Sequence, residues 1–324
     1  DEASSLGKVN DSISTFTNKK TTEVVSIYNK TWLWLSPTWE MPKSIYWGKE
    51  DWTKGIKVDR ESYEAFLYGT QFLKQIQVPI SSSVLKEMFA PVANVEAKKH
   101  MRATSFEPIF GIPMVLPLLD GDSEQLYQKF QSILRKNQDL KNDDLQLELL
   151  AGMKESVIPV STDDYRLTIL YYSGDLSRGN MHIRAVIEDV IPSVASEIQR
   201  ILKQLKSKGL KEIQQMFGLE PNRMYRTETL PSLLANAYGP GYIWGSLQAT
   251  LHREPLTIDR LKLATMKKLN ELANKEAYWE MKQELVFYYS FVFFLKKYIE
   301  NILQRGKEVK ELTNWQGIID AYHN

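Results

Sequence analysis

The clearest pattern of hydrophobic and polar positions lies between Tyr165 and Gly209. Two runs rich in β-branched and aromatic residues, 165–172 and 181–190, flank a polar turn, which predicts a β-hairpin with a long loop. A helix is expected to follow from Pro192, because proline suits the first helical turn. Its apolar residues form one stripe at helical spacing: Val194, Ile198, Ile201, Leu202 and Leu205.

The helix after the hairpin is expected to cover 193–208 and to end at Gly209, a residue type that commonly closes helices. Lysines occupy its last turns, where the helix dipole favours cations: Lys203, Lys206 and Lys208. We therefore interpret these lysines as stabilising the end of the helix.

From Leu230 onward, helical patterns replace strand patterns. The strongest periodicity alternates spacings of three and four, and its members are Tyr278, Met281, Leu285, Tyr288, Val292, Leu295, Ile299 and Ile302. A second apolar stripe lies beside it, formed by Phe287, Phe291, Phe294 and Tyr298. A helix that is apolar over so much of its circumference belongs inside a bundle. Two helices are expected before it, one after the turn 239–241, with Gly245 at a point of close packing, and one starting at 255–257.

The N-terminal part begins with a polar segment, 1–20, which we interpret as a mobile lead-in. The residues up to Trp52 are strand-like and then rich in tryptophan. This density of rings indicates small buried hairpins or a docking surface, with stacking on nucleic-acid bases as the alternative. A helix is predicted from Ser62, as its N-cap, to about Ile76.

Two further features precede the hairpin. Three prolines within 106–119 indicate an edge strand or a crossing segment rather than a central strand. Two helices are expected between 122 and 155, the second starting near Asp143 or Asp144 and carrying Leu149 and Leu150.

Together these patterns predict an α+β fold. A mixed α/β N-terminal portion carries the antiparallel hairpin backed by a helix, and an all-α C-terminal helical bundle follows. The expected divisions are a polar lead-in, a Trp-rich region of strands and helices, an α/β region with the central hairpin and helix, and the bundle: 1–20, 21–120, 121–221 and 222–324.

Composition narrows the class of protein. The chain has 324 residues, of which 43% are hydrophobic and 25% charged, as in an ordinary globular protein. The longest apolar run, 285–295, is too short to span a bilayer, so we expect no membrane contact. Cysteine is absent, which excludes disulfides and thiolate metal sites and favours a cytoplasmic location. The net charge is +1, so nucleic-acid binding would need a local basic patch or help from partners.

Catalytic motifs are missing or weak. The histidines stand without metal-ligand spacing, and the glycine-rich stretch 239–245 lacks the Lys-Ser/Thr of a phosphate-binding loop. Acidic pairs at 143–144, 163–164 and 188–189 suit turns, caps or a helix N-terminus better than a metal. Ser193 has no base at a recognisable spacing. We therefore expect a binding protein and no enzyme, with no cofactor and no metal.

The motif IRAVIEDVIPS at 183–193 resembles the strand-to-helix junction of the large subunit of type I-B CRISPR effector complexes (Cascade). Upstream, FEPIFGIPMVLPLL resembles the proline-marked strand of that family. Downstream, LTIDRLKLATMKKL and the long aromatic helix resemble its C-terminal helical region. The resemblance covers roughly residues 60–300. The family often carries paired cysteines, implying a zinc knuckle, in the region corresponding to 20–60, and this chain has none.

The resemblance implies a non-catalytic subunit of an RNA-guided surveillance complex. Such a subunit helps to recognise the short motif that flanks a DNA target, contacts the displaced strand through its helical end and helps to recruit a helicase-nuclease. Its partners would be guide RNA, target DNA, and the backbone and small subunits of the complex. The alternative, from another functional class, is an intracellular scaffold whose helical half binds only protein.

Nucleic-acid contacts are expected at basic side chains that lie off the apolar stripes, since those on the stripes are needed for packing. On and just after the C-terminal helices these candidates are Lys262, Lys267, Lys268, Lys282, Lys296, Lys297 and Arg305, and a separate basic cluster adds Lys98, Lys99 and Arg102. The alternative is that they lie on solvated helix faces, balanced by nearby glutamates.

Overall fold

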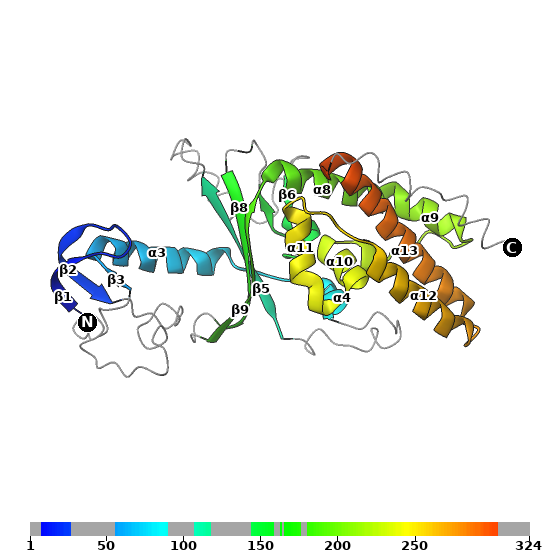
Figure 1. The fold of residues 1–324 in the computed structure, drawn as a ribbon, viewed down its shortest axis with the longest axis horizontal. Helices are drawn as coiled ribbons and strands as arrows, with labels where there is room; N and C mark the ends of the chain where they lie inside the picture. The colour runs from blue at the N-terminus through cyan, green and yellow to red at the C-terminus, as the bar shows by residue number, and fades with distance from the viewer. Residues whose placement is uncertain are drawn as a thin grey trace. The chain divides into compact units, whose positions relative to one another are not determined.

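The computed structural model describes residues 8–26, 56–89, 107–117, 144–158, 163, 165–175 and 180–303. The chain divides into two compact units, one formed by Asp1–Gln77 with Tyr172–Ile183 and the other by Val78–Tyr171 with Arg184–Asn324. The fold is α+β, with antiparallel sheets and a helical C-terminal region (Figure 1). The Trp-rich stretch and the first helix expected after residue 122 lie outside the described residues.

The first unit contains strands within the segment that we interpreted as a lead-in. The strands follow the order β1-β2-β3, with β1 at Lys8–Ile13, β2 at Lys20–Ser26 and β3 at Lys57–Val58. β1 and β2 are antiparallel, and Val9 lies opposite Val24. The expectation of a mobile segment over 1–20 is therefore wrong for 8–20, because these polar residues pair along the backbone rather than through an apolar face.

Helix α3 (Arg60–Ile76) follows β3, and its N-cap differs from the predicted one. The side chain of Asp59 accepts a hydrogen bond from the backbone N–H of Ser62 at 2.8 Å. Thr17 donates a second hydrogen bond to Asp59, at 2.9 Å. These bonds hold the pKa of Asp59 well below its ordinary value. Asp59, and not Ser62, therefore caps the helix and ties it to the β1–β2 turn.

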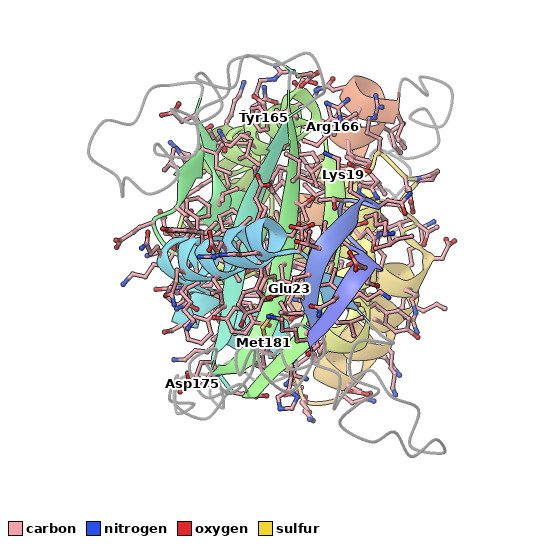
Figure 2. The ribbon with its side chains drawn as sticks, turned by 90° about the vertical axis from the view of Figure 1, so that its left-hand side faces the viewer. Lys19, Glu23, Tyr165, Arg166, Asp175 and Met181 are labelled. Atoms are coloured by element: carbon pink, nitrogen blue, oxygen red, sulfur yellow. The ribbon has the colours of Figure 1, made fainter. Side chains whose placement is uncertain are left out.

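The main sheet has the strand order β4-β5-β8-β9. Its strands are β4 (Val78–Pro79), β5 (Ile109–Pro117), β8 (Tyr165–Asp175) and β9 (Asn180–Val190). Figure 2 shows Tyr165 and Asp175 at the two ends of β8, with Met181 of β9 near the end that carries Asp175. β5 lies between β4 and β8 in the sheet, so the prediction that it is an edge strand is wrong. β4 covers only Phe110 and Gly111, however, so Pro113 lies beyond that pairing.

Shorter elements connect the sheet to the helices. Helix α4 (Ser82–Phe89) follows β4, and β6 (Leu145–Gln146) pairs with β7 (Val157–Ile158). Helix α7 (Leu147–Ala151) is shorter than the predicted second helix of 122–155, because Gly152 takes a left-handed conformation with φ of 76° and ends it.

The helix after β9 does not end at Gly209. Helix α8 (Pro192–Gln204) passes through a π-helical turn, η5 (Leu205–Gly209), into α9 (Leu210–Met216). Gly209 has helical dihedrals, with φ of −57° and ψ of −47°. A Cβ atom built on it would lie 3.3 Å from the ring of Phe293. Gly209 is thus required for close helix packing, and the predicted cap at this residue is wrong.

The C-terminal helices are α10 (Leu230–Tyr238), α11 (Ile243–Leu251), α12 (Asp259–Ala273) and α13 (Tyr278–Tyr298), with a π-helical turn η8 (Ile299–Leu303) at the end of α13. Figure 1 shows α12 running alongside α13, and α8, η5 and α9 also contact α13. The helix before residue 222 therefore belongs to the same packed unit, and the chain does not divide at 221–222 as expected.

The two apolar stripes of α13 differ in how much of their length is buried. The stripe of Phe287, Phe291, Phe294 and Tyr298 is at most 1% exposed. The stripe with the stronger periodicity starts on the surface, since Tyr278 is 65% exposed. The Tyr298 hydroxyl lies within hydrogen-bond distance of two carbonyl oxygens, those of Thr250 at 3.1 Å and Glu254 at 2.9 Å, and can donate its single proton to either. The end of α13 is thereby tied to the end of α11.

Replacing Gly209 by leucine is expected to lower the free energy of unfolding by about 1–3 kcal/mol, because the new side chain would overlap the Phe293 ring. Gly245 is the matched control, since among the described residues a Cβ there meets no atom within 4 Å. This open space also shows that Gly245 does not mark close packing. Gly245→Leu should raise the free energy of unfolding by about 0.5–1 kcal/mol, because leucine favours a helix more than glycine does. Urea denaturation measures both changes, and equal effects would contradict the packing of η5 on α13.

Candidate nucleic-acid interface

One of the predicted contact lysines, Lys268, lies in a buried ion-pair cluster. The guanidinium of Arg226, in the 3₁₀ turn η6 (Tyr225–Thr227), donates to both carboxylate oxygens of Glu284 on α13, at 2.7 and 3.2 Å. Lys268 on α12 donates to the same carboxylate at 2.6 Å. The three side chains are only 10–17% exposed. Glu284 therefore holds two cations beneath the surface.

The cluster continues through neutral and acidic groups to two more helices. Arg226 donates to the side-chain oxygen of Asn236 on α10 at 3.0 Å. Asn236 in turn donates to Glu87 on α4 at 2.9 Å. The guanidinium of Arg226 also lies 3.9 Å from the centre of the Phe287 ring. We call the set Glu87, Arg226, Asn236, Lys268 and Glu284 the buried polar cluster.

The charge state of Glu284 determines whether the ammonium of Lys268 can bind a phosphate. Burial alone would raise the pKa of Glu284, but Arg226 and Lys268 outweigh it, so the pKa of this carboxyl lies below its ordinary value of 4.5. Glu284 is thus ionised at neutral pH, and its carboxylate forms an ion pair with the ammonium of Lys268. This ion pair with a residue from another helix counts against Lys268 as a surface cation for phosphate.

The other residues predicted to contact nucleic acid differ in whether an acidic side chain lies close to them. Lys296 and Lys297 lie 3.9 and 2.9 Å from Glu300, so both share one carboxylate. Lys262 lies 3.9 Å from Asp259, and Lys267 is exposed on the same helix. Lys282 is exposed, and its ammonium lies 3.8 Å from the position of a Cβ at Gly218, just past α9. Lys98, Lys99, Arg102 and Arg305 lie outside the described residues.

A basic surface that the sequence interpretation missed lies on α8–α9. Its members, named here the α8–α9 basic surface, are Lys203, Lys206, Lys208 and Lys211. The helix dipole does not explain them, because the helix continues to Met216 and the lysines lie in its middle. Lys208 lies 3.7 Å from Glu212, and the other lysines have no acidic partner among the described residues. The sequence signal is the density of lysines in 203–211, which a helix end at Gly209 also accounts for.

The π-helical turn shapes this surface. Residues 206–208 and 211 are exposed, whereas Leu205, Gly209 and Leu210 are buried against the helical core. Lys206, Lys208 and Lys211 are therefore exposed on the part of the helix that does not pack in the core, and Lys203 beside them is half-buried. From 203 to 211 the helix rises by about 12 Å, which corresponds to roughly three to four nucleotide steps along the axis of a stacked strand, at about 3.4 Å per step. Single π turns within α-helices occur frequently at functional sites.

The candidate catalytic groups have structural roles. The Ser193 hydroxyl donates to the carboxylate of Asp163 at 2.6 Å, and the Ser193 N–H donates to it at 2.9 Å. Asp163 thus serves as a cap for the first turn of α8, which is the ordinary use of an aspartate. His252 contacts the backbone carbonyl of Glu188 at 2.6 Å. Within the described part of the chain, no group of three or more His, Asp or Glu side chains could hold a metal ion.

Among the helices that the structure describes, none is long and apolar enough to cross a membrane. No protein-family model matches the chain, and no curated protein or solved structure shows significant similarity to it.

Glu284→Gln is expected to lower the free energy of unfolding by about 3–5 kcal/mol at neutral pH, because it leaves two buried cations without a counter-charge. The folded-state pKa of Glu284 is depressed, so its ionised form stabilises the fold above the ordinary value of 4.5. This contribution is lost as the pH falls through the lower folded-state value. In urea denaturation, the difference between variant and wild type should therefore stay constant from about pH 7 down to the ordinary value of 4.5 and shrink as the pH falls further.

Glu300→Gln is the matched control, because the Lys296 and Lys297 side chains that it pairs with are 31% and 35% exposed. Its loss should cost less than about 1 kcal/mol. An equal loss at the two positions, or a Glu284 effect that does not change with pH, would contradict the role given to the buried polar cluster.

Proposed function

We propose that the chain is the non-catalytic large subunit of a cytoplasmic type I-B CRISPR surveillance complex. In this role it helps to recognise the motif that flanks a DNA target, holds the displaced strand and recruits the helicase-nuclease. Its partners are guide RNA, target DNA and the backbone and small subunits. Base pairing between guide and target reads the sequence, while the protein reads the flanking motif and the backbone.

The observation that carries the proposal is the position of the α8–α9 basic surface. The junction motif at 183–193 leads from β9 into α8, and α8 continues through the π turn into α9. The family resemblance and the lysines without acidic partners therefore occur on consecutive elements. A chain with a net charge of +1 needs such a local surface to attract phosphates.

A specific observation favours the second candidate function, a scaffold that binds only protein. α12 exposes Leu263 and Met266 at 75% and 67% of their surfaces, and Tyr278 and Trp279 are exposed at the start of α13. Exposed apolar side chains of this size are frequent at protein–protein contacts. In a multi-subunit complex the two functions are compatible, with protein contacts on α12 and nucleic-acid contacts on α8–α9.

Purification of the tagged full chain from its native cells, followed by sequencing of the RNA that it carries, tests the function. Guide RNAs of uniform length with repeat-derived ends are expected. Co-purification of proteins without guide RNA would support the scaffold and contradict the proposal.

Neutralising Lys206 and Lys211 together, as Lys206→Gln and Lys211→Gln, is expected to weaken binding of single-stranded nucleic acid. The slope of log affinity against log salt should become shallower by about 0.7 for each lost phosphate contact. The matched control removes the same charge at Lys296 and Lys297, whose shared partner is Glu300. Fluorescence anisotropy over a range of salt measures both pairs. A larger effect from the control pair would place the contact on α13 instead of on α8–α9.

A further inference from the structure

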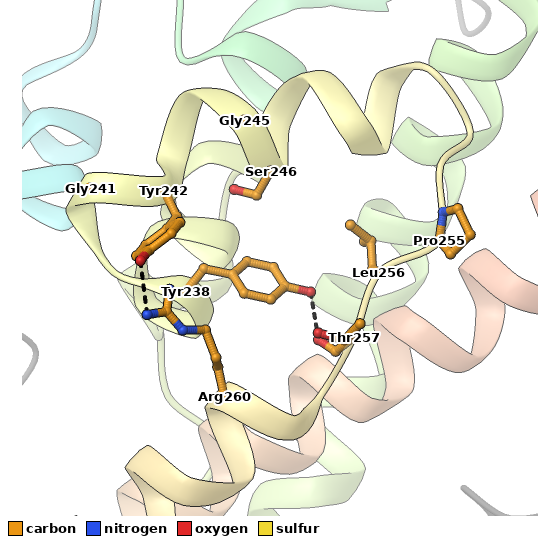
Figure 3. Close-up of a pocket in the computed structure, with 9 residues that line it drawn as sticks. All are labelled: Tyr238, Gly241, Tyr242, Gly245, Ser246, Pro255, Leu256, Thr257 and Arg260. Atoms are coloured by element: carbon orange, nitrogen blue, oxygen red, sulfur yellow. Dashed lines mark hydrogen bonds between the residues drawn. The ribbon is translucent and has the colours of Figure 1, made fainter.

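The cavity beside the turn 239–241 combines exposed aromatic surface with an unneutralised cation. Its volume is about 500 Å³, within the range of about 300–1,000 Å³ typical of small-ligand pockets. Figure 3 shows Tyr238 and Tyr242 reaching in from one side and Arg260, from the first turn of α12, rising towards Tyr242. All of these groups belong to the second compact unit.

The rings are held by hydrogen bonds and leave surface exposed. The Tyr238 hydroxyl donates to the carbonyl oxygen of Thr257 at 2.8 Å, which fixes this ring across the cavity. Tyr242 is 55% exposed. The guanidinium of Arg260 lies 3.8 Å from the centre of the Tyr242 ring and donates to its hydroxyl at 3.0 Å. The arginine and the tyrosine are thus held together before any ligand arrives.

Comparison with two other arginines that lie over aromatic rings distinguishes Arg260. Arg226, over Phe287, is neutralised by Glu284. Arg223, over Tyr225, forms an ion pair with Glu228. Among the described residues Arg260 has no carboxylate partner, and Tyr242 is the partner that the structure gives it. Its remaining N–H groups can donate to an anion.

Glycines keep the wall of the cavity free of side chains. A Cβ atom at Gly241 or at Gly245 would meet no atom of the described residues within 4 Å. Gly245 lies in the first turn of α11, and within a helix a glycine costs up to about 1 kcal/mol relative to alanine. Packing does not require glycine at this position, whereas an open cavity wall does.

We propose that this cavity binds one nucleotide of a single-stranded nucleic acid, with its base stacked on the Tyr242–Arg260 pair and its phosphate bound by Arg260. Aromatic and arginine planes are the groups on which proteins stack unpaired bases. The inference rests on the proposed function and adds a base-binding position to the phosphate contacts of α8–α9. The site tolerates different bases, since stacking uses the face that every base has.

The test measures binding of the full-length chain to a labelled single-stranded oligodeoxythymidine and to an abasic chain of the same length. Tyr242→Ala is expected to weaken binding of the oligodeoxythymidine by about 5- to 100-fold and to leave the salt dependence unchanged. It should also reduce the preference over the abasic chain. Tyr242→Phe keeps the ring and should bind within about 3-fold of wild type. Arg260→Gln should weaken binding and make the salt slope shallower by about 0.7.

Tyr225→Ala is the matched control, because Tyr225 is 50% exposed and also lies beneath an arginine. If Tyr242→Ala binds like wild type while the Lys206/Lys211 pair is weakened, the cavity proposal is overturned and the proposed function stands. If the wild-type chain binds neither oligonucleotide, both are overturned. If Tyr242→Ala keeps nucleic-acid binding but loses a protein from the purified assembly, the cavity is a protein contact and the proposal is wrong.

Discussion

The packing of the helices in the second compact unit depends on one buried carboxylate, that of Glu284. Glu284 accepts hydrogen bonds from Arg226 and Lys268, and through Arg226 and Asn236 it is linked to Glu87. These side chains come from α4, η6, α10, α12 and α13, so a single cluster fixes the position of α13 against its neighbours. An unpaired buried charge costs several kcal/mol, which makes every member of the cluster dependent on the others. Hydrophobic burial along Phe287, Phe291 and Phe294 stabilises the same helix without specifying its partner.

The need to pair buried charges divides the basic residues of the second compact unit into two groups, those paired with carboxylates and those without such a partner among the described residues. Arg226 and Lys268 are used to hold the fold, and Lys296 and Lys297 share Glu300 at the surface. The α8–α9 basic surface differs because Gly209 turns its buried side towards α13 and leaves the lysines outside. Charge that is not used in folding is free to attract phosphates. The sites proposed on α8–α9 and beside Arg260 both follow from this division.

Patterns that depend on neighbours in sequence could be predicted, and features that depend on distant partners could not. The periodicities that begin at Tyr165 and Val194 correctly indicated strand and helix, since side-chain spacing is local. The end of the helix at Gly209 was wrong because Phe293, on another helix, accounts for that glycine. The ion pair of Lys268 could not be predicted, because its partner Glu284 lies on another helix and contacts it only when α12 packs on α13. No periodicity in 238–260 signals a cavity, because it forms between a turn, a loop and three helices.

Photo-crosslinking tests most directly whether nucleic acid follows the cations that the fold leaves unpaired. The full chain would be bound to a single-stranded DNA with photoreactive thymidines, irradiated and analysed by peptide mass spectrometry. Crosslinks are expected in the peptides that contain Lys203–Lys211 of α8–α9 and in those that contain Tyr242 and Arg260. Crosslinks confined to the later turns of α12 and to α13, around Lys267 and Lys296, with none in α8–α9 and none at Tyr242 or Arg260, would contradict the assignment.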